Sequence, residues 1–255
     1  MLNIIFCALD EEHSIKHFVD KILSQMQEIN QPFRIIACLD GSTDKSYQIM
    51  QDLAKSKPII LLPIIEQKDL GKAFKRIFDY LLSEEPNNQS LKNDEDVIIS
   101  MDTDLTHQTE KIGELLNYFK NHNLDLLVGS RFVNDSQVKN FPLYRIAISR
   151  ITAFILKILF PVIKINGEKL QDYTSGYRIY KLSIIKKLKN KFMDNFIREP
   201  EFTYTCEILI NLSQLKIKID EAPIYYDYQQ KINNSKLNIL KNFKRLIILI
   251  VRLCR

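Results

Sequence analysis

The sequence predicts an α/β fold built on a mostly parallel sheet flanked by helices. In the first half of the chain, short apolar runs rich in β-branched residues alternate with longer amphipathic segments. This alternation is typical of parallel strands joined by right-handed helical crossovers. Charged side chains follow several of the apolar runs directly. Ligands of open α/β sheets bind just beyond the carboxyl ends of the strands, so these residues are the first candidates for a site.

The first strand is expected over residues 3–9, ends at Leu9 and is followed by Asp10, Glu11 and Glu12. We expect Asp10 to cap a helix that runs to about residue 28. The two glutamates would then lie in its favourable first turn.

The second strand is expected over residues 33–39 and leads into the turn Asp40–Ser46. Gly41 supplies a tight bend, and Ser42 or Thr43 can cap the helix that follows. A strand, a glycine turn and a helix N-terminus form a natural nucleotide site, but an ordinary βα turn has the same pattern.

A third, short strand is expected over residues 58–62, followed by a helix over residues 70–82. Gly71 and Lys72 stand at the start of this helix, where a lysine can meet a phosphate, although such a lysine is more often solvated. The polar, Asn-rich stretch 84–95 predicts a surface loop.

Residues 96–104 form the central stretch of the prediction. A short apolar run predicts a buried strand, and it ends in Asp102 and Asp104. Side chains two residues apart in an extended segment point the same way, so both carboxylates can face one Mg²⁺ or Mn²⁺ ion. The alternative is an acidic turn in which Asp104 only caps the next helix.

A helix over residues 108–119 and a strand over residues 125–129 complete the alternating half, and Arg131 follows the strand. Arginine grips phosphate oxygens in bidentate fashion. Because parallel strands end at one edge of a sheet, this half predicts a nucleoside-diphosphate pocket formed by Asp10, Asp40, Asp102, Asp104 and Arg131.

The apolar segment 144–165 predicts a helix with Arg150, Lys157 and Lys164 along one stripe, seven residues apart. A transmembrane span is the alternative, but no uncharged run approaches about 18 residues. A central Lys157 would also cost about 2.5–3.5 kcal/mol, and Pro161 interrupts the helix. We favour a helix lying in the membrane interface over a span or an internal helix.

The rest of the second half is less regular. In the stretch 171–180, Arg178 is expected to be buried against an anion or a carboxylate. A helix is expected over residues 202–212 and a strand over residues 215–219. From residue 234 to 251 a basic amphipathic helix is expected, whose apolar run is too short to span a bilayer but suits an anionic leaflet.

Positive charge is concentrated in two segments of a chain whose net charge is +5. Residues 136–167 contain five basic and no acidic residues, and residues 228–255 contain seven basic and no acidic residues. The remainder of the chain has more acidic than basic residues. This asymmetry indicates an anionic partner met by the two segments.

The cysteines and the first residues favour a cytoplasmic protein. The four cysteines lie far apart and form no Cys-x-x-Cys pair, so no zinc ribbon, redox motif or disulfide framework is expected. Residues 1–6 lack the basic start and long apolar core of a secretory leader.

Seven short motifs occur along the chain in a fixed order: Asp10-Glu11-Glu12, Asp40-Gly41-Ser42-Thr43-Asp44, Asp102-Thr103-Asp104, Gly129-Ser130-Arg131-Phe132, Thr174-Ser175-Gly176-Tyr177-Arg178, Glu221-Ala222-Pro223-Ile224 and Ser235-Lys236. Together they resemble the family 2 glycosyltransferases of the GT-A fold, over about residues 3–240. The likeness is nearest to the dolichyl-phosphate mannosyltransferase and undecaprenyl-phosphate glycosyltransferase group. The resemblance implies a GT-A catalytic domain over residues 1–230 and a basic amphipathic helix over residues 231–255.

The resemblance implies an inverting transfer from a GDP- or UDP-sugar to a membrane polyprenyl phosphate, with no nucleic-acid partner. It implies Mg²⁺ or Mn²⁺ on Asp102 and Asp104, and a peripheral location on the cytoplasmic face of a membrane. The implied catalytic residues are Asp104, Asp172 and Arg131. The implied donor-binding residues are Leu9, Asp10, Glu12, Asp40, Gly71, Lys72, Asp102, Thr103, Asp104 and Arg131, and the implied acceptor-binding residues are Thr106, Ser175, Arg178, Ser235 and Lys236.

A phosphate acceptor needs little general-base help, because a phosphate monoester is largely dianionic near pH 7. Asp172 would then position the acceptor, whereas with a sugar hydroxyl as acceptor Asp172 is the expected base. Leu39 stands where the family has an Asp near the nucleobase, so the sequence does not indicate which nucleobase the donor contains. We expect His107 to be a satisfied polar residue at a helix start rather than a third metal ligand.

Three other functions fit parts of the sequence. One is a family 2 transferase that glycosylates a hydroxyl of a glycolipid or polysaccharide. A sugar nucleotidyltransferase is less expected, because the stretch Leu9–Glu12 is acidic and lacks the Gly-rich basic loop of those enzymes. A non-catalytic binding module is disfavoured by the intact Asp102/Asp104 pair.

Overall fold

The computed structural model describes residues 1–66, 68–83, 93–232 and 239–254. The strands are β1 (Leu2–Cys7), β2 (Phe33–Cys38), β3 (Ile59–Leu61), β4 (Val97–Ser100), β5 (Leu126–Ser130), β6 (Gln137–Lys139), β7 (Arg178–Lys181), β8 (Ile219–Pro223) and β9 (Tyr225–Asp227). The α-helices are α1 (Ile15–Ile29), α2 (Ser46–Ala54), α3 (Leu70–Leu82), α4 (Ile112–Asn121), α5 (Leu143–Leu159), α6 (Leu182–Phe192), α7 (Thr203–Ser213) and α8 (Ile239–Leu253). Short 3₁₀ turns cover Thr109–Lys111, Met193–Asn195 and Tyr228–Gln230.

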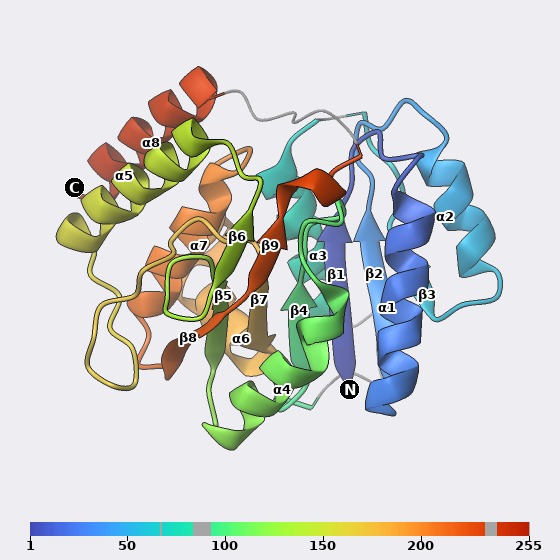
Figure 1. Ribbon diagram of the computed structural model, residues 1–255, viewed down its shortest axis with the longest axis horizontal. Coiled ribbons are helices and arrows are strands. Elements are labelled where there is room, and N and C mark those ends of the chain that lie inside the picture. Colours follow the sequence, from blue (N-terminus) through green and yellow to red (C-terminus); the bar gives the residue numbers. More distant parts are fainter. Residues whose placement is uncertain (67, 84–92, 233–238, 255) are drawn as a thin grey trace.

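The central sheet has seven strands in the order β3-β2-β1-β4-β7-β5-β8 (Figure 1). The pairs among β1, β2, β3 and β4 are parallel, as is β5 with β8, and β7 runs antiparallel to both of its neighbours. The predicted mostly parallel sheet is therefore confirmed. The antiparallel β7, which sequence pattern alone did not indicate as such, separates β4 from β5.

The sheet lies between two apolar layers. One core joins its first face to α1, α2 and α4 and includes Phe18, Met50 and Leu116. The other core joins the opposite face to α3, α6 and α7 and extends to α5 and α8, through Leu156 and Leu249. Strands buried on both faces explain why the apolar runs of the sequence are continuous rather than alternating.

A second, two-stranded sheet pairs β6 with β9 in parallel. Both strands have only three residues, too short for a periodic pattern, and the sequence did not predict them. Tyr226 in β9 also bridges to His107, just after β4. The bridge brings β9 near the turn after β4, and Lys231, which follows β9 closely in the chain, reaches Asp104.

The starts of two helices differ from the prediction. Asp10 does not cap α1, which begins at Ile15 after Ser14. Ser42 and Thr43 do not cap α2, because the backbone N–H of Ser46 donates to the carboxylate of Asp44. Instead, the loop between β1 and α1 forms hydrogen bonds with the loop between β2 and α2. These bonds involve Asp10, Ser42 and Thr43, the residues that were expected to cap the helices.

The predicted helix 144–165 ends early, at Leu159. Pro161 lacks a backbone N–H and disfavours helical geometry at the residue before it. Lys164 therefore lies outside the helix. Its buried ammonium pairs with Glu168 at 2.9 Å and approaches Glu221 at 3.9 Å, so the predicted stripe of three basic residues is wrong for Lys164.

The predicted strand 215–219 is displaced, since β8 begins at Ile219 and includes Asp220 and Glu221. These carboxylates are tolerated in a strand because Tyr118 donates to Asp220 at 2.9 Å and two backbone N–H groups donate to Glu221. Within the described residues, no helix has the length and apolarity needed to cross a bilayer. Ser235, Lys236 and most of the predicted loop 84–95 lie outside the described residues.

Candidate active site

Two cavities open on the carboxyl ends of the strands. The strand-end cavity, of about 380 Å³, lies at the ends of β1, β2 and β4 and at the start of α3. The helix cavity, of about 200 Å³, is bounded by α5, α7 and α8. Four residues line both cavities: Asp102, Asp104, Phe202 and Lys231. The two cavities therefore meet at the acidic pair that the sequence singled out.

The turn after β4 orients Asp104. Leu105 adopts a φ of 64°, uncommon for a branched side chain, and this bend returns the chain toward Asp104. The backbone N–H and the hydroxyl of Thr106 both donate to Oδ1 of Asp104, at 3.2 and 2.5 Å. Thr106, predicted to bind an acceptor, is buried and instead fixes the rotamer of Asp104.

Asp102 and Asp104 have different electrostatic surroundings. Burial raises the pKa of Asp102, and the charge of Asp104 adds to that rise. Burial would also raise the pKa of Asp104, but the Lys231 ammonium and the Thr106 hydroxyl outweigh it and hold that pKa below its ordinary value. Lys231 Nζ lies 2.5 Å from Asp104 Oδ2.

The acidic pair fits a divalent cation that arrives with a phosphate ligand. Among the described residues, no group of three or more His, Cys, Asp or Glu side chains is arranged to hold a metal ion. Mg²⁺, however, takes only one or two carboxylates where water and substrate phosphates complete its shell. Asp102 and Asp104 would hold such an ion together.

His107 is buried between Tyr177 and Tyr226. Its Nδ1 accepts a hydrogen bond of 3.3 Å from the backbone N–H of Asp102. This ring nitrogen is therefore occupied by the backbone, as expected for a satisfied polar residue.

The strand-end cavity contains five of the predicted donor-binding residues: Leu9, Asp40, Asp102, Thr103 and Asp104. Asp40 Oδ1 accepts from the guanidinium of Arg76 and from the backbone N–H of Ile65. Its other oxygen is buried with no hydrogen-bond partner among the described residues. Charged residues that the sequence analysis did not select also line this cavity: Glu11, Lys68, Asp69, Glu201, Lys231 and Lys241.

Asp10 and Glu12 are absent from the cavity lining and instead join two loops. Asp10 Oδ1 accepts from the backbone N–H of Thr43 at 2.7 Å, and Glu12 accepts from the backbone N–H of Lys45 at 3.1 Å. In return, Ser42 accepts from the N–H of Asp10. Both acids therefore join the two loops beside the cavity, and contact between them and the donor stays a prediction.

Gly71 and Lys72 are also absent from the described lining of the strand-end cavity. A Cβ on Gly71 would lie 2.0 Å from the carbonyl oxygen of Glu199, so glycine is needed where α3 meets the segment before α7. Asp69 caps α3 by accepting from the N–H of Lys72 at 3.1 Å and lines the cavity itself. An N-cap search of the sequence would have found Asp69.

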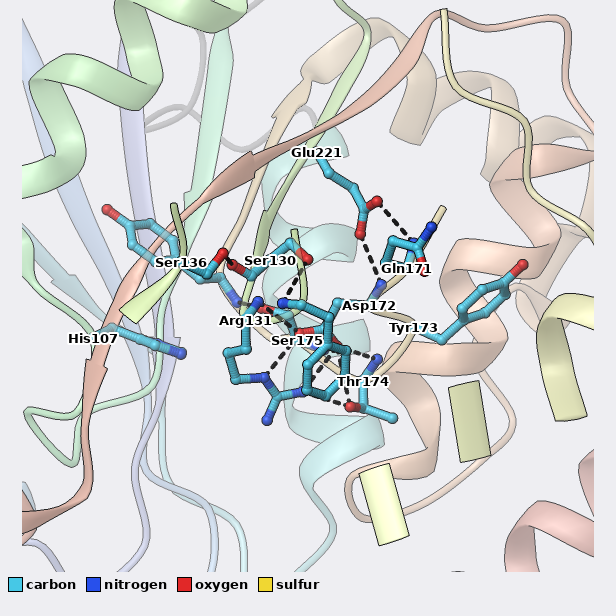
Figure 2. Close-up of polar contacts among 12 residues, drawn as sticks. His107, Ser130, Arg131, Ser136, Gln171, Asp172, Tyr173, Thr174, Ser175 and Glu221 are labelled. Atoms are coloured by element: carbon cyan, nitrogen blue, oxygen red, sulfur yellow. Dashed lines mark hydrogen bonds and ion pairs between the residues drawn. The ribbon is translucent and has the colours of Figure 1, made fainter. Parts of the chain in front are cut away.

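Arg131 and Asp172 form a buried ion pair at the wall of the helix cavity (Figure 2). Arg131 donates through Nε and Nη2 to the two oxygens of Asp172, both at 2.8 Å, and through Nη2 to Thr174 at 2.6 Å. The N–H groups of Arg131, Thr174 and Ser175 donate to the same carboxylate. Arg131 was predicted at the donor diphosphate, but it lines the helix cavity and not the strand-end cavity.

Asp172 is unsuited to act as a base. Its side chain is 0% exposed, and although burial raises its pKa, Arg131 and the donated hydrogen bonds lower it below the ordinary value. Glu221 in turn accepts from the N–H groups of Gln171 and Asp172, both at 2.7 Å (Figure 2). These contacts favour a positioning role for Asp172, through Arg131, over the role of a base, which was expected only for a sugar-hydroxyl acceptor; the role stays a prediction.

Two residues predicted to bind the acceptor, Arg178 and Ser175, are buried and have protein partners. Arg178 is 1% exposed and donates to the backbone carbonyls of Thr205 and Tyr173, not to a carboxylate. Ser175 is buried, and its hydroxyl accepts from the N–H of Tyr177. Both residues shape the loop that carries Asp172.

The helix cavity is lined by both apolar and charged side chains. Ile148 of α5 and Phe243 and Leu246 of α8 are among the apolar ones. The charged ones are Asp102, Asp104, Arg131, Arg145 and Lys231. Arg145, the third residue of α5, was not selected from the sequence, and only the packing of α5 against the site places it in the same cavity as Arg131.

Comparison with known proteins agrees with this geometry. The model of glycosyl transferase family 2 matches residues 3–189. The chain is 25% identical over 185 residues to the dolichol-phosphate mannosyltransferase of Pyrococcus furiosus, covering 72% of this chain and 47% of that relative. It is 26% identical to the polyprenol monophosphomannose synthase of Mycolicibacterium smegmatis, covering 63% and 56%. The chain thus spans about half the length of these two curated relatives.

A third relative matches over almost its whole length. The UDP-N-acetylglucosamine–dolichyl-phosphate N-acetylglucosaminyltransferase of Methanococcus voltae is 24% identical, and the match covers 98% of this chain and 96% of the relative.

Among solved structures, the glucosyl-3-phosphoglycerate synthase of Mycobacterium tuberculosis, crystallised with Mn²⁺, UDP and phosphoglyceric acid, has a TM-score of 0.62 at 15% identity. The match covers 100% of this chain and 78% of that one. Staphylococcus aureus TarS with UDP-GlcNAc has a TM-score of 0.59 at 14% identity, covering 98% and 65%. At these identities the structures establish the shared fold, that of the GT-A glycosyltransferases.

Proposed function

We propose that this chain, which belongs to glycosyl transferase family 2, moves a sugar from a nucleotide-sugar donor to a polyprenyl phosphate at a membrane. The family membership makes it a glycosyltransferase. The observation that carries the choice of acceptor is the helix cavity. Apolar side chains of α5 and α8 and the guanidinium groups of Arg131 and Arg145 line it, and it shares Asp102 and Asp104 with the strand-end cavity.

The strand-end cavity is the proposed donor site. Strand ends and the start of α3 surround it, as expected for a nucleotide at a topological switch of an α/β sheet. Asp102 and Asp104 would hold Mg²⁺ or Mn²⁺ there. The ion supplies Lewis-acid neutralisation of the charge that develops on the departing nucleoside diphosphate. Leu9, Asp40 and Thr103 line the part proposed for the nucleoside.

The helix cavity is the proposed acceptor site. The acceptor phosphate would meet Arg131 and Arg145, and its prenyl chain would leave between α5 and α8. Asp172 keeps Arg131 charged and oriented, so the guanidinium is preorganised before the acceptor binds. A phosphate monoester is already largely dianionic near pH 7, and this agrees with an Asp172 that is fully occupied and unable to accept a proton from a hydroxyl.

The faces of α5 and α8 are the proposed membrane contact. The two helices lie side by side at one end of the molecule (Figure 1), and residues of both line the helix cavity. Their exposed large apolar side chains include Leu143, Tyr144, Ile151, Phe154, Ile158, Leu240, Phe243, Ile247, Ile248 and Val251. Ten large apolar side chains exposed on two helices favour contact with a membrane over contact with water alone. Basic residues of both helices favour an anionic leaflet, and we propose a peripheral position on its cytoplasmic face.

The decisive experiment incubates the full chain in membranes with labelled GDP- and UDP-sugars, with and without Mn²⁺. Label is expected in an acid-labile lipid, and Asp104→Asn is expected to abolish it. Asp20→Asn, which removes an exposed carboxylate on α1, is the matched control and should retain transfer. Robust transfer in excess chelator, or transfer only to sugar hydroxyls, would overturn the proposal.

Membrane contact has its own test in vesicle flotation. Phe154→Ser together with Phe243→Ser should reduce flotation with anionic vesicles several-fold. Met193→Ser removes an apolar side chain that is 67% exposed away from α5 and α8 and should change nothing. Equal flotation of all three proteins would remove α5 and α8 as the contact.

A further inference from the structure

Both oxygens of Asp104 already have protein partners. Thr106 donates twice to Oδ1, and the ammonium of Lys231 lies 2.5 Å from Oδ2. The side chains of Asp104 and Lys231 are each only 15% exposed, so water screens this ion pair weakly. A divalent cation bound at Oδ2 would lie beside this ammonium, and the two positive charges would repel each other at short range.

Lys231 lies where the two cavities meet. Among the described lining residues, it is the one basic residue that borders both. It directly follows the 3₁₀ turn Tyr228–Gln230, whose start is fixed by Asp227 accepting from the N–H of Gln229 at 3.1 Å. The backbone of Lys231 also donates to the carbonyl of Tyr228 at 3.2 Å. The backbone is thus held, while the long side chain has rotatable bonds with which to change partner.

We propose that Lys231 is a built-in counter-ion that occupies the metal carboxylate in the free enzyme and makes the divalent cation and the nucleoside diphosphate bind together. When a cation displaces the ammonium, Lys231 is left beside a like charge. When a diphosphate enters with the cation, Lys231 exchanges a carboxylate oxygen for a phosphate oxygen. The inference rests on the proposed function, which places a nucleoside diphosphate in the strand-end cavity.

This exchange predicts a positive coupling between two ligands. A ligand that removes an unfavourable contact made by the other raises its affinity, and the effect is reciprocal. The metal alone therefore binds weakly to the wild type. The diphosphate relieves the repulsion, and each ligand strengthens the binding of the other through Lys231.

The test measures Mn²⁺ binding to the full chain by electron paramagnetic resonance of the free ion, without sugar or lipid, and then with UDP or GDP. Lys231→Met should bind Mn²⁺ alone about tenfold more tightly than the wild type, because Oδ2 of Asp104 is open. The gain in Mn²⁺ affinity that the diphosphate confers should be about tenfold smaller in Lys231→Met, whereas Lys231→Arg should keep most of it.

Lys241→Met is the matched control. Lys241 lines the strand-end cavity but pairs with Glu201, at 2.5 Å, instead of with Asp104. Its loss should leave the affinity for Mn²⁺ alone unchanged. Asp104→Asn should abolish binding, and thermal unfolding of each variant checks that the fold persists.

The outcomes separate the inference from the proposed function. If Lys231→Met binds Mn²⁺ no more tightly than the wild type, the counter-ion role is wrong even where UDP or GDP binds normally. If UDP and GDP raise the Mn²⁺ affinity of Lys231→Met as much as they raise that of the wild type, the proposed exchange of Lys231 from carboxylate to phosphate is wrong. If neither diphosphate binds the wild type, the donor assignment fails and the coupling with it, whereas the Mn²⁺ titration without nucleotide still decides whether Lys231 competes for Asp104.

Discussion

Two arginine–carboxylate clusters, one buried and one with a partly exposed arginine, differ in how many carboxylates each guanidinium pairs with. In the Asp172 cluster, Arg131 pairs with one carboxylate, that of Asp172. This carboxylate also accepts hydrogen bonds from backbone N–H groups and from the hydroxyl of Thr174. In the Arg252 cluster, the single guanidinium of Arg252 at the end of α8 serves both Glu199, at 2.9 Å, and Glu207. One Glu199 oxygen is buried with no hydrogen-bond partner among the described residues.

The carboxyl groups of the two clusters have pKa shifts of opposite direction. Burial raises the pKa in every case, but the paired and fully hydrogen-bonded Asp172 ends below its ordinary value. Glu199 and Glu207 share the guanidinium of Arg252, and Glu207 also accepts from two backbone N–H groups, yet burial keeps both pKa values above the ordinary value. The first cluster is an ion pair at the site with one carboxylate for one guanidinium. The second cluster joins α8 to α7 and has one carboxylate more than it has guanidinium groups.

The largest effect is expected on transfer by Asp172→Asn. The amide keeps the shape of the side chain but leaves Arg131 without a charged partner, so kcat/KM should fall by about 100-fold. Because Arg131 lines the helix cavity, the KM for the polyprenyl phosphate should rise while that for the nucleotide sugar stays near the wild-type value. A uniform loss with both KM values unchanged would mean that Asp172 acts only on the fold.

The next effect is on stability, through Arg252→Met. Breaking a buried pair costs about 3–5 kcal/mol; because the Arg252 side chain is 26% exposed, we expect about 2 kcal/mol after screening. Denaturant unfolding measures this loss. Adding Glu199→Gln to Arg252→Met should recover part of it, because one of the two stranded carboxylates is removed. Strict additivity of the two changes would contradict the shared-cation account.

The pH dependence of unfolding should then have opposite signs in the two clusters. The lowered pKa of Asp172 contributes stability that is present above about pH 3.9, its ordinary value, and is lost as pH falls through the folded value. The deficit of Asp172→Asn should therefore shrink on acidification.

The raised pKa of Glu207 contributes stability that is present below about pH 4.3 and is lost as pH rises through the folded value. Glu207→Gln should therefore gain stability relative to the wild type as pH rises toward neutrality. Each unit of pKa difference corresponds to about 1.4 kcal/mol. Urea unfolding at several pH values checks both signs, and parallel curves for the two variants would contradict the comparison.

The smallest effect is expected for Thr174→Val. It removes the hydroxyl that accepts from Arg131 at 2.6 Å but leaves the bidentate pair intact, so the cost is about 1 kcal/mol of stability and a few-fold in transfer. Thr205→Val, which removes a local hydroxyl-to-backbone bond in α7, is the control that should leave transfer unchanged. A loss as large as that of Asp172→Asn would mean that the hydroxyl, and not the carboxylate, orients Arg131.

The local sequence pattern was sufficient to predict the position of a side chain where that side chain directly follows a strand of the parallel sheet. Asp40, Asp102 and Asp104, which the strand-end pattern brought to one edge, line the strand-end cavity, because a parallel sheet gathers its carboxyl ends at one edge. The same pattern put Asp10 there, but its carboxylate accepts from the backbone N–H of Thr43 in the neighbouring loop. A sequence does not show which of several donors a carboxylate will find.

By itself, the sequence determined the alternating α/β fold, the acidic pair after β4 and the two amphipathic basic helices, since each follows from residues that are neighbours in the chain. Only the tertiary structure decided that Lys231 reaches Asp104, that Asp172 is buried against Arg131 and that Arg145 lines the same cavity as Arg131. The two ion pairs join residues 127 and 41 positions apart in the chain. Their partners then lower the pKa values of Asp104 and Asp172 against the effect of burial, which is a property of the packed interior and not of local sequence.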